Sequence, residues 1–317
     1  MSFPVFDLHC DTALTLVQKG KDSGETLRKN MGHIDLERAK ALPGYCQCFA
    51  CFSTTGEGLP SGISATTLFE REMDAVMGQI EENSDWIRLA YSAEDVEENQ
   101  RIGLMSGILT VEGPAGFGFD PELLEDLYKA GFRISSLGWN EKNVLTGSNV
   151  TGGGLTDLGR EYVKEAQRVG IGVDVSHISD AGFWDIIKIT EKPIIATHSN
   201  SRQVWNHSRN LTDDMFRAIC ETGGVAGLNL YSVFIGREPD LDTACAHILH
   251  FLELDNDGRH IALGGDLDGC DQLPMGFEGV ESYPALAQCL LRHGVGETIV
   301  RRIFWENSLE VLRSCST

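Results

Sequence analysis

Three histidines and three acidic residues of this chain lie at or just after the ends of short apolar runs. They are His9, Asp11, Glu112, His177, His198 and Asp266. Neutral imidazoles and carboxylates are the ligands that zinc and similar divalent ions prefer in proteins. One such residue alone is more often a hydrogen-bonding group than a ligand, but six at similar positions indicate a shared site. Six ligands exceed one tetrahedral site, so the set predicts two ions that share a bridging carboxylate.

The spacing around the first and last of these residues adds detail. His9 and Asp11 are two residues apart, and an extended chain directs both side chains to the same side. Asp266 begins the sequence Asp-Leu-Asp-Gly, where the carboxylates repel one another unless water, a metal ion or a cationic side chain lies beside them. We expect Asp266, at the end of its apolar run, to face the ions, and Asp268 to cap the following turn.

The elements that would position these residues alternate along the chain. Eight apolar runs are candidate strands, at residues 4–9, 44–52, 104–112, 131–137, 170–177, 193–198, 224–231 and 260–266. Helical periodicity marks residues 65–83, 121–131, 156–170 and 213–224. Runs that are apolar throughout are typical of parallel strands buried on both faces. The pattern therefore predicts an α/β protein, a single (β/α)8 TIM-like barrel domain over residues 1–317, with functional side chains at the C-terminal ends of the strands.

The amino-acid composition limits the classes of molecule that the protein can be expected to bind. The formal net charge is −21, which makes nucleic acids and anionic membrane surfaces poor partners and favours divalent cations. The sequence shows no signal peptide and no apolar stretch of the roughly 20 residues that a membrane helix needs. Nine cysteines with irregular spacing are typical of reduced thiols, so a cytoplasmic location is expected. Cys46, Cys48 and Cys51 are expected to be buried thiols rather than zinc ligands.

Several motifs together resemble one known family. They are FDLHCDT, LTVEG, GLTDLGREYVKEAQRVGIGVDVSHIS, PIIATHSNSR, SRNLTDDM and LGGDLDG, which span about residues 5–270. In this order they are similar to the renal (membrane) dipeptidases, zinc-dependent members of the amidohydrolase barrel superfamily. The resemblance implies a metallo-dependent hydrolase barrel that cleaves dipeptides, with or without a D-residue at the C-terminal position, through a hydroxide bridging two Zn²⁺ ions. It also suggests a homodimer.

The resemblance assigns roles to the metal ligands. His9 and Asp11 would hold one zinc, His177 and His198 would hold the other, and Glu112 would bridge the two. A glutamate can bridge because its two oxygens can bind different ions.

Two further residues take roles from the resemblance. Asp266 would take a proton from the attacking water and pass it to the leaving amine. Arg209 would bind the C-terminal carboxylate of the substrate, because a guanidinium can form two parallel hydrogen bonds to a carboxylate.

One position departs from the family pattern. Trp139, followed by Asn140, occupies the place of a histidine that is thought to polarise the substrate carbonyl. Indole donates one hydrogen bond but cannot become a cation. Three hypotheses follow: a dipeptidase in which Trp139, Asn140 or the metals replace this histidine, an amidohydrolase acting on another small amide or N-acyl amino acid, or a metal-binding protein without peptidase activity.

Overall fold

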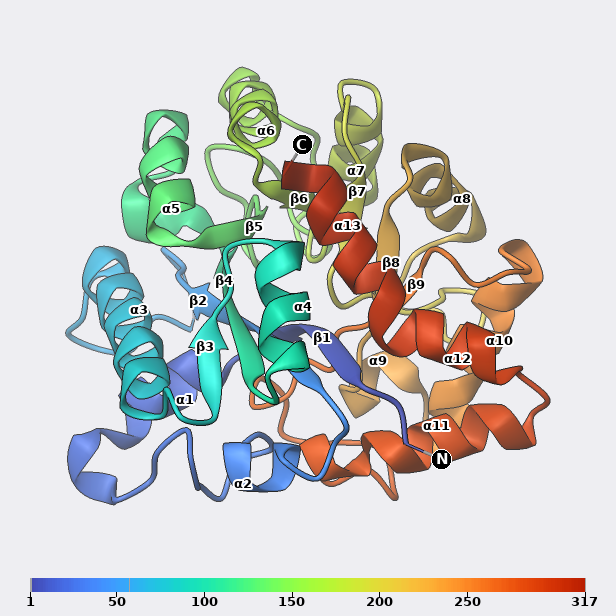
Figure 1. The fold of residues 1–317 in the computed structure, drawn as a ribbon. Helices are drawn as coiled ribbons and strands as arrows, with labels where there is room; N and C mark the ends of the chain where they lie inside the picture. Colours follow the sequence, from blue (N-terminus) through green and yellow to red (C-terminus); the bar gives the residue numbers. More distant parts are fainter. Residues whose placement is uncertain (1, 57, 317) are drawn as a thin grey trace.

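The computed structural model of the protein describes residues 2–56 and 58–316. Within them, nine parallel strands form one sheet: β1 (Val5–Cys10), β2 (Tyr45–Phe52), β3 (Ile87–Leu89), β4 (Met105–Glu112), β5 (Phe132–Ser136), β6 (Gly172–Asp174), β7 (Ile194–Ala196), β8 (Val225–Leu228) and β9 (Ile261–Leu263). The strand order is β2-β1-β9-β8-β7-β6-β5-β4-β3, and β2 also pairs with β4. This last pairing closes eight strands into a barrel, which confirms the predicted fold (Figure 1).

The ninth strand, β3, is a short addition to the barrel that the sequence did not predict. It pairs with Met105–Gly107 at the start of β4, while β5 pairs with the same strand only from Leu109 onward. β2 takes up the opposite edge of β4 along Ser106–Glu112. Three residues with an exposed Arg88 in the middle are too short for an apolar pattern to show.

Each of the eight predicted runs overlaps one barrel strand; β1 extends one residue beyond its run, and several other strands end earlier than expected. The run 170–177 forms a strand only at Gly172–Asp174, and the run 260–266 only at Ile261–Leu263. The residues after these strands turn sharply, since His177 and Asp266 have φ angles of 69° and 56°. Residues other than glycine rarely adopt such a left-handed conformation, and strained backbone of this kind is common at functional sites.

Helices surround the barrel on its outside (Figure 1). They are α1 (Thr12–Lys19), α2 (Leu36–Ala39), α3 (Ala65–Glu82), α4 (Ala93–Arg101), α5 (Leu124–Ala130), α6 (Asp157–Val169), α7 (Asp180–Ile187), α8 (Asp213–Thr222), α9 (Ser232–Ile235), α10 (Leu241–Leu254), α11 (Tyr283–Arg292), α12 (Glu297–Arg301) and α13 (Asn307–Ser316). Three predicted helices correspond to α3, α6 and α8, while the fourth begins as a 3₁₀ turn at Pro121–Leu123 and continues as α5. Ser64, Thr156 and Thr212 cap α3, α6 and α8 by accepting a backbone hydrogen bond, which fixes where these helices start.

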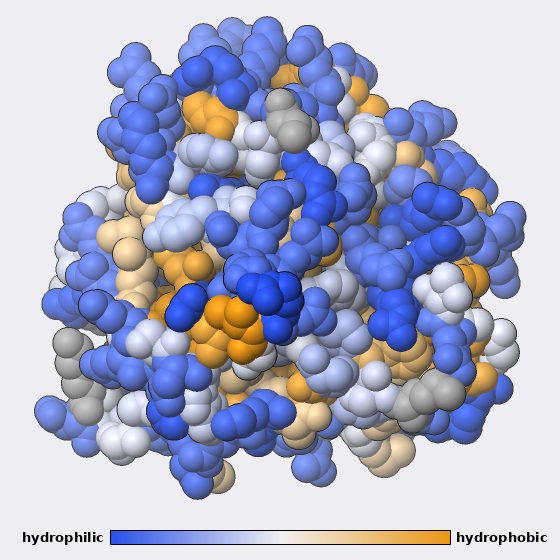
Figure 2. Space-filling model, in the orientation of Figure 1, coloured by the Kyte–Doolittle hydropathy of each residue, from blue (hydrophilic) through white to orange (hydrophobic). Residues whose placement is uncertain are grey.

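The N-terminal end of the barrel is closed by the last helix. Inward-facing strand residues such as Phe6, Cys48 and Ile108 form one buried cluster with Leu309 and Leu312 of α13. Figure 1 shows α13, in red, crossing this end, and Figure 2 shows that the same face is mainly hydrophilic outside. The cluster fills the barrel from below, so chemistry is left to the opposite end, where the strands finish.

The cysteine and membrane expectations can be compared with the structure. Cys46, Cys48 and Cys51 are free and buried, as predicted. Among the helices of residues 2–56 and 58–316, none combines the length and the apolar composition that a membrane span requires.

Candidate metal centre and active site

The six residues singled out from the sequence meet at the C-terminal ends of the barrel strands. His9 lies in β1, Asp11 directly follows it, Glu112 ends β4, and the turns after β6, β7 and β9 carry His177, His198 and Asp266. All six are buried. Two overlapping groups have ligand atoms within 4.8 Å of one another: His9 with Glu112 and His198, and His9 with Asp11 and Asp266.

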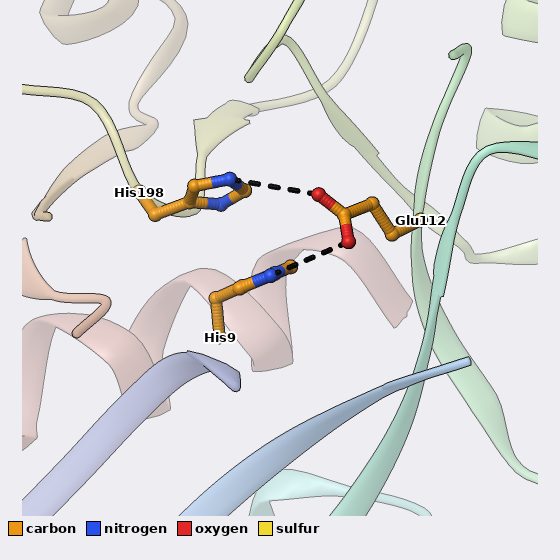
Figure 3. A group of neighbouring side chains, drawn as sticks. All are labelled: His9, Glu112 and His198. Atoms are coloured by element: carbon orange, nitrogen blue, oxygen red, sulfur yellow. Dashed lines mark ion pairs between the residues drawn. The ribbon is translucent and has the colours of Figure 1, made fainter. Parts of the chain in front are cut away.

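Glu112 lies between two sets of histidines and presents a different oxygen to each (Figure 3). Its Oε2 is 3.7 Å from Nε2 of His9. Its Oε1 is 3.0 Å from Nε2 of His177 and 3.8 Å from Nε2 of His198. A carboxylate with its two oxygens facing separate imidazole groups has the arrangement that a bridging ligand needs.

The hydrogen bonds of two histidines orient their rings toward a cation. Nδ1 of His177 donates to Oδ1 of Asn140 at 2.9 Å, so its Nε2 carries a lone pair. Thr197 donates its hydroxyl proton to Asp174 and therefore accepts from Nδ1 of His198 at 2.7 Å, which leaves a lone pair on that Nε2 as well. The two Nε2 atoms are 3.1 Å apart. Two lone pairs at this distance repel each other, so the pair fits a site for a positive ion.

The part of the centre around His9 also contains a potential ligand atom without a hydrogen-bond partner. Nε2 of His9 is buried and has no hydrogen-bond partner among residues 2–56 and 58–316. It lies 3.4 Å from Oδ2 of Asp11 and 3.9 Å from Oδ1 of Asp266. A buried nitrogen without a partner is costly unless a ligand satisfies it. The donor types and this orphaned atom therefore fit a divalent cation.

The pKa shifts of two acids and two histidines in the centre also favour the binding of a cation. Burial raises the pKa of Glu112 and Asp266, and the neighbouring Asp11 carboxylate raises both further. Burial lowers the pKa of His177 and His198, and the positive charge of Arg209 adds to this effect. These two imidazoles are thus neutral, which is the form that binds a metal, and a cation would relieve the repulsion among the acids.

Arg209 lies beside this centre as a buried cation. Its Nη2 donates to the carbonyl oxygen of His198 at 3.4 Å and its Nη1 to Ser199 at 3.3 Å, both long hydrogen bonds. Its Nε is buried and has no partner within the described part of the chain. A buried guanidinium with spare donors is suited to bind an anionic group of a ligand.

Trp139 and Asn140 follow β5 at the same end of the barrel. The Trp139 ring centroid is 6.2 Å from that of His177 and 5.1 Å from that of Phe52, against which it packs edge-on. Trp139 thus lies next to the candidate centre. Asn140 contacts His177 directly, so it orients this imidazole.

Three polar residues in contact with the site were missed by sequence reasoning. Asp174 and Thr197 fix the tautomer of His198, and Nδ2 of Asn229 donates to Oδ2 of Asp266 at 2.9 Å. Thr197 directly precedes His198 in the sequence, which was the available signal. Asn229 carried none, because its partner is 37 residues away.

The expectation for Asp268 was wrong. Its carboxylate accepts hydrogen bonds from the Thr12 hydroxyl at 2.6 Å and from the backbone N–H of His33 at 2.5 Å. Asp268 therefore ties the loop after β9 to the beginning of α1 and to the segment before α2, rather than capping its own turn. The partners lie more than 200 residues away, so local turn patterns could not identify them.

Two curated relatives of the chain carry dipeptidase names. An uncharacterised dipeptidase of Schizosaccharomyces pombe is 34% identical over 217 residues, which cover 66% of this chain and 53% of the relative. The dipeptidase VerJ of Clonostachys rogersoniana is 31% identical over 77% of this chain and 64% of its own length. The chain thus spans about half of the first relative and somewhat less than two thirds of the second.

Structural and family comparisons extend over the whole chain. A metallopeptidase from Rhodobacter sphaeroides, solved with a phosphinate mimic of the dipeptide L-Ala-D-Ala, superposes with a TM-score of 0.90. It shares 26% sequence identity, and the match covers 99% of this chain and 100% of the solved one. The profile of the membrane dipeptidases, peptidase family M19, matches residues 1–317. The chain therefore belongs to the membrane dipeptidase family, whose metal-dependent hydrolases are the class that the sequence predicted.

Proposed function

We propose that this protein hydrolyses dipeptides with two divalent ions, Zn²⁺ being the expected metal. Family membership supports a metal-dependent dipeptidase. The observation that carries the proposal of two ions is the position of Glu112, whose two oxygens face different histidines. His9 and Asp11 would hold one ion, and His177 and His198 the other.

The residues around the ions would share the remaining work. When bound, the ions supply a water of lowered pKa and polarise the scissile carbonyl. Asp266, oriented by Asn229, would accept the proton of the attacking water and donate it to the leaving amine. Arg209 would bind the C-terminal carboxylate of the substrate and hold the peptide bond in register with these groups.

A second candidate function rests on Trp139. Because an indole next to His177 replaces the usual histidine, the site could favour another small amide or an N-acyl amino acid. The substrate panel below separates the two functions.

The experiment combines metal analysis with a substrate panel. Protein treated with a chelator should lose activity and regain it on addition of Zn²⁺, and elemental analysis should find at least two ions per chain. The panel should contain L-L and L-D dipeptides, because the Rhodobacter relative binds a mimic of L-Ala-D-Ala, together with N-acyl amino acids. Turnover of N-acyl amino acids alone would favour the second function. No turnover of any dipeptide by protein with both ions bound would contradict the first.

The cytoplasmic location and the homodimer stay predictions. Sedimentation of the purified protein would test the second of them.

A further inference from the structure

Away from the barrel mouth, which is the C-terminal end of the barrel where the six candidate residues meet, helices α10 and α11 bring three potential metal ligands together. The two helices pack side by side in the outer layer (Figure 1). Cys289 lies in the last turn of α11 and His293 directly follows this helix, four residues further on, so the two side chains lie on one side of the helix end. Asp242 lies in the first turn of α10 and faces them. A pair of ligands at this helical spacing is a common way to hold zinc.

The distances among the three side chains are close to those around a bound ion. Oδ1 of Asp242 is 2.9 Å from Nε2 of His293 and 3.2 Å from Sγ of Cys289. All three ligand atoms lie within 4.8 Å of one another. Metal–ligand bonds of about 2.0–2.3 Å in a tetrahedral zinc site place ligand atoms about 3.3–3.7 Å apart. Small side-chain rotations would therefore open the group enough to admit an ion.

The surroundings combine a fixed ligand with access from solvent. Cys289 is fully buried, whereas the side chains of Asp242 and His293 are 61% and 41% exposed. Arg292 lies 4.0 Å from Asp242 as a competing cation, but it is 62% exposed and free to turn toward water. The Cys245 thiol also lies next to Cys289, so the site requires reducing conditions.

We propose that Asp242, Cys289 and His293 bind a borderline-soft divalent ion such as Zn²⁺ or Co²⁺, with water as the fourth ligand. A thiolate with an imidazole selects such ions over Mg²⁺ and Ca²⁺, which prefer oxygen ligands. On binding, the Cys289 thiol releases its proton to solvent, and neutral His293 contributes Nε2 in place of its hydrogen bond to Asp242. The ion would link the start of α10 to the end of α11.

Cobalt distinguishes this site from the barrel mouth by its spectrum. The full-length reduced protein is titrated with Co²⁺, and the near-ultraviolet charge-transfer band of a cobalt–thiolate bond is followed. The ligands proposed for the barrel mouth are imidazoles and carboxylates, so they give no such band. The expected result is a band whose final intensity corresponds to one cobalt–thiolate bond per chain, while the barrel mouth takes up further cobalt without contributing to the band. Cys289→Ser should abolish it, and Asp242→Ala and His293→Ala should each weaken cobalt binding at this site at least tenfold.

The matched control is Cys220→Ser, since Cys220 is a partly exposed thiol on α8 that belongs to none of the ligand groups found in the described residues. This variant should keep the full band. Three results would overturn the proposal: no band in the wild-type protein, a band that persists in Cys289→Ser, or cobalt affinity unchanged in both Asp242→Ala and His293→Ala. None of them depends on peptidase activity, so the proposed function stands or falls separately.

Discussion

The position of Asp266 is compatible with two roles, that of a metal ligand and that of a proton-transferring group. Its Oδ1 is 3.9 Å from Nε2 of His9, within reach of an ion bound there, while Oδ2 accepts from Asn229. Asp266 would face the ions in either role, as a metal ligand or as the group that transfers the proton. Replacing its carboxylate with an amide separates the two roles, because an amide has the same size but cannot carry the proton.

We expect Asp266→Asn to reduce kcat by about 100-fold or more, which is typical for the loss of a general acid–base. The metal content should stay close to that of the wild-type protein. Asp271→Asn, which changes an exposed carboxylate five residues further on, is the control and should keep full activity. Steady-state kinetics and elemental analysis measure both effects. Loss of metal in Asp266→Asn would make this residue a ligand, and surviving turnover would remove it from proton transfer.

At the scale of elements, β7, β8 and β9 approach one another so closely that a glycine becomes necessary. A Cβ at Gly264, just after β9, would lie 1.7 Å from the carbonyl oxygen of Thr197 and 3.3 Å from Cα of His198. No side chain fits there without moving the backbone that carries this histidine. The close packing of the strand ends thus fixes the position of a candidate ligand.

Gly264→Ala should therefore destabilise the protein by about 3 kcal/mol or more, in the range of severe overpacking, and weaken metal binding. The matched control is Gly78→Ala in α3, where a Cβ would meet nothing within 4 Å. That substitution should stabilise the helix by about 0.5–1 kcal/mol. Denaturant unfolding of both variants measures the difference. Equal stability of the two variants would show that the strand ends can shift freely.

Sequence patterns predicted the elements better than the contacts between them. All eight barrel strands were predicted because strands buried on both faces are apolar throughout, a signal that survives without any knowledge of neighbours. The ends of β6 and β9 were predicted too far along, since the turns that carry His177 and Asp266 are also rich in small and apolar residues. Asp268 was misjudged because its partners, Thr12 and His33, belong to a distant part of the chain.

For the molecule as a whole, the candidate centre gathers like charges that a bound cation would compensate. Folding buries Asp11, Glu112 and Asp266 together in a protein whose formal net charge is already −21. Their mutual repulsion is compensated only in part by Arg209 and His9. The unfolded chain does not hold these ligands together, so an ion that binds the folded form shifts the equilibrium toward it.

Zinc should therefore raise the melting temperature of the whole protein. Free Zn²⁺ at 1,000 times its Kd adds about 4 kcal/mol to the free energy of unfolding for one site, which corresponds to a shift of several degrees. The measurement compares zinc-loaded with chelator-treated protein, in a Cys289→Ser background so that the site between α10 and α11 makes no contribution. Glu112→Gln added to this background should remove most of the shift, because it removes the carboxylate that faces both histidine groups. The same melting curve bears on the prediction of one domain over residues 1–317, since one cooperative unit gives a single transition. If zinc left the melting temperature unchanged, or raised it equally after Glu112→Gln, the residues around Glu112 would not be the metal centre.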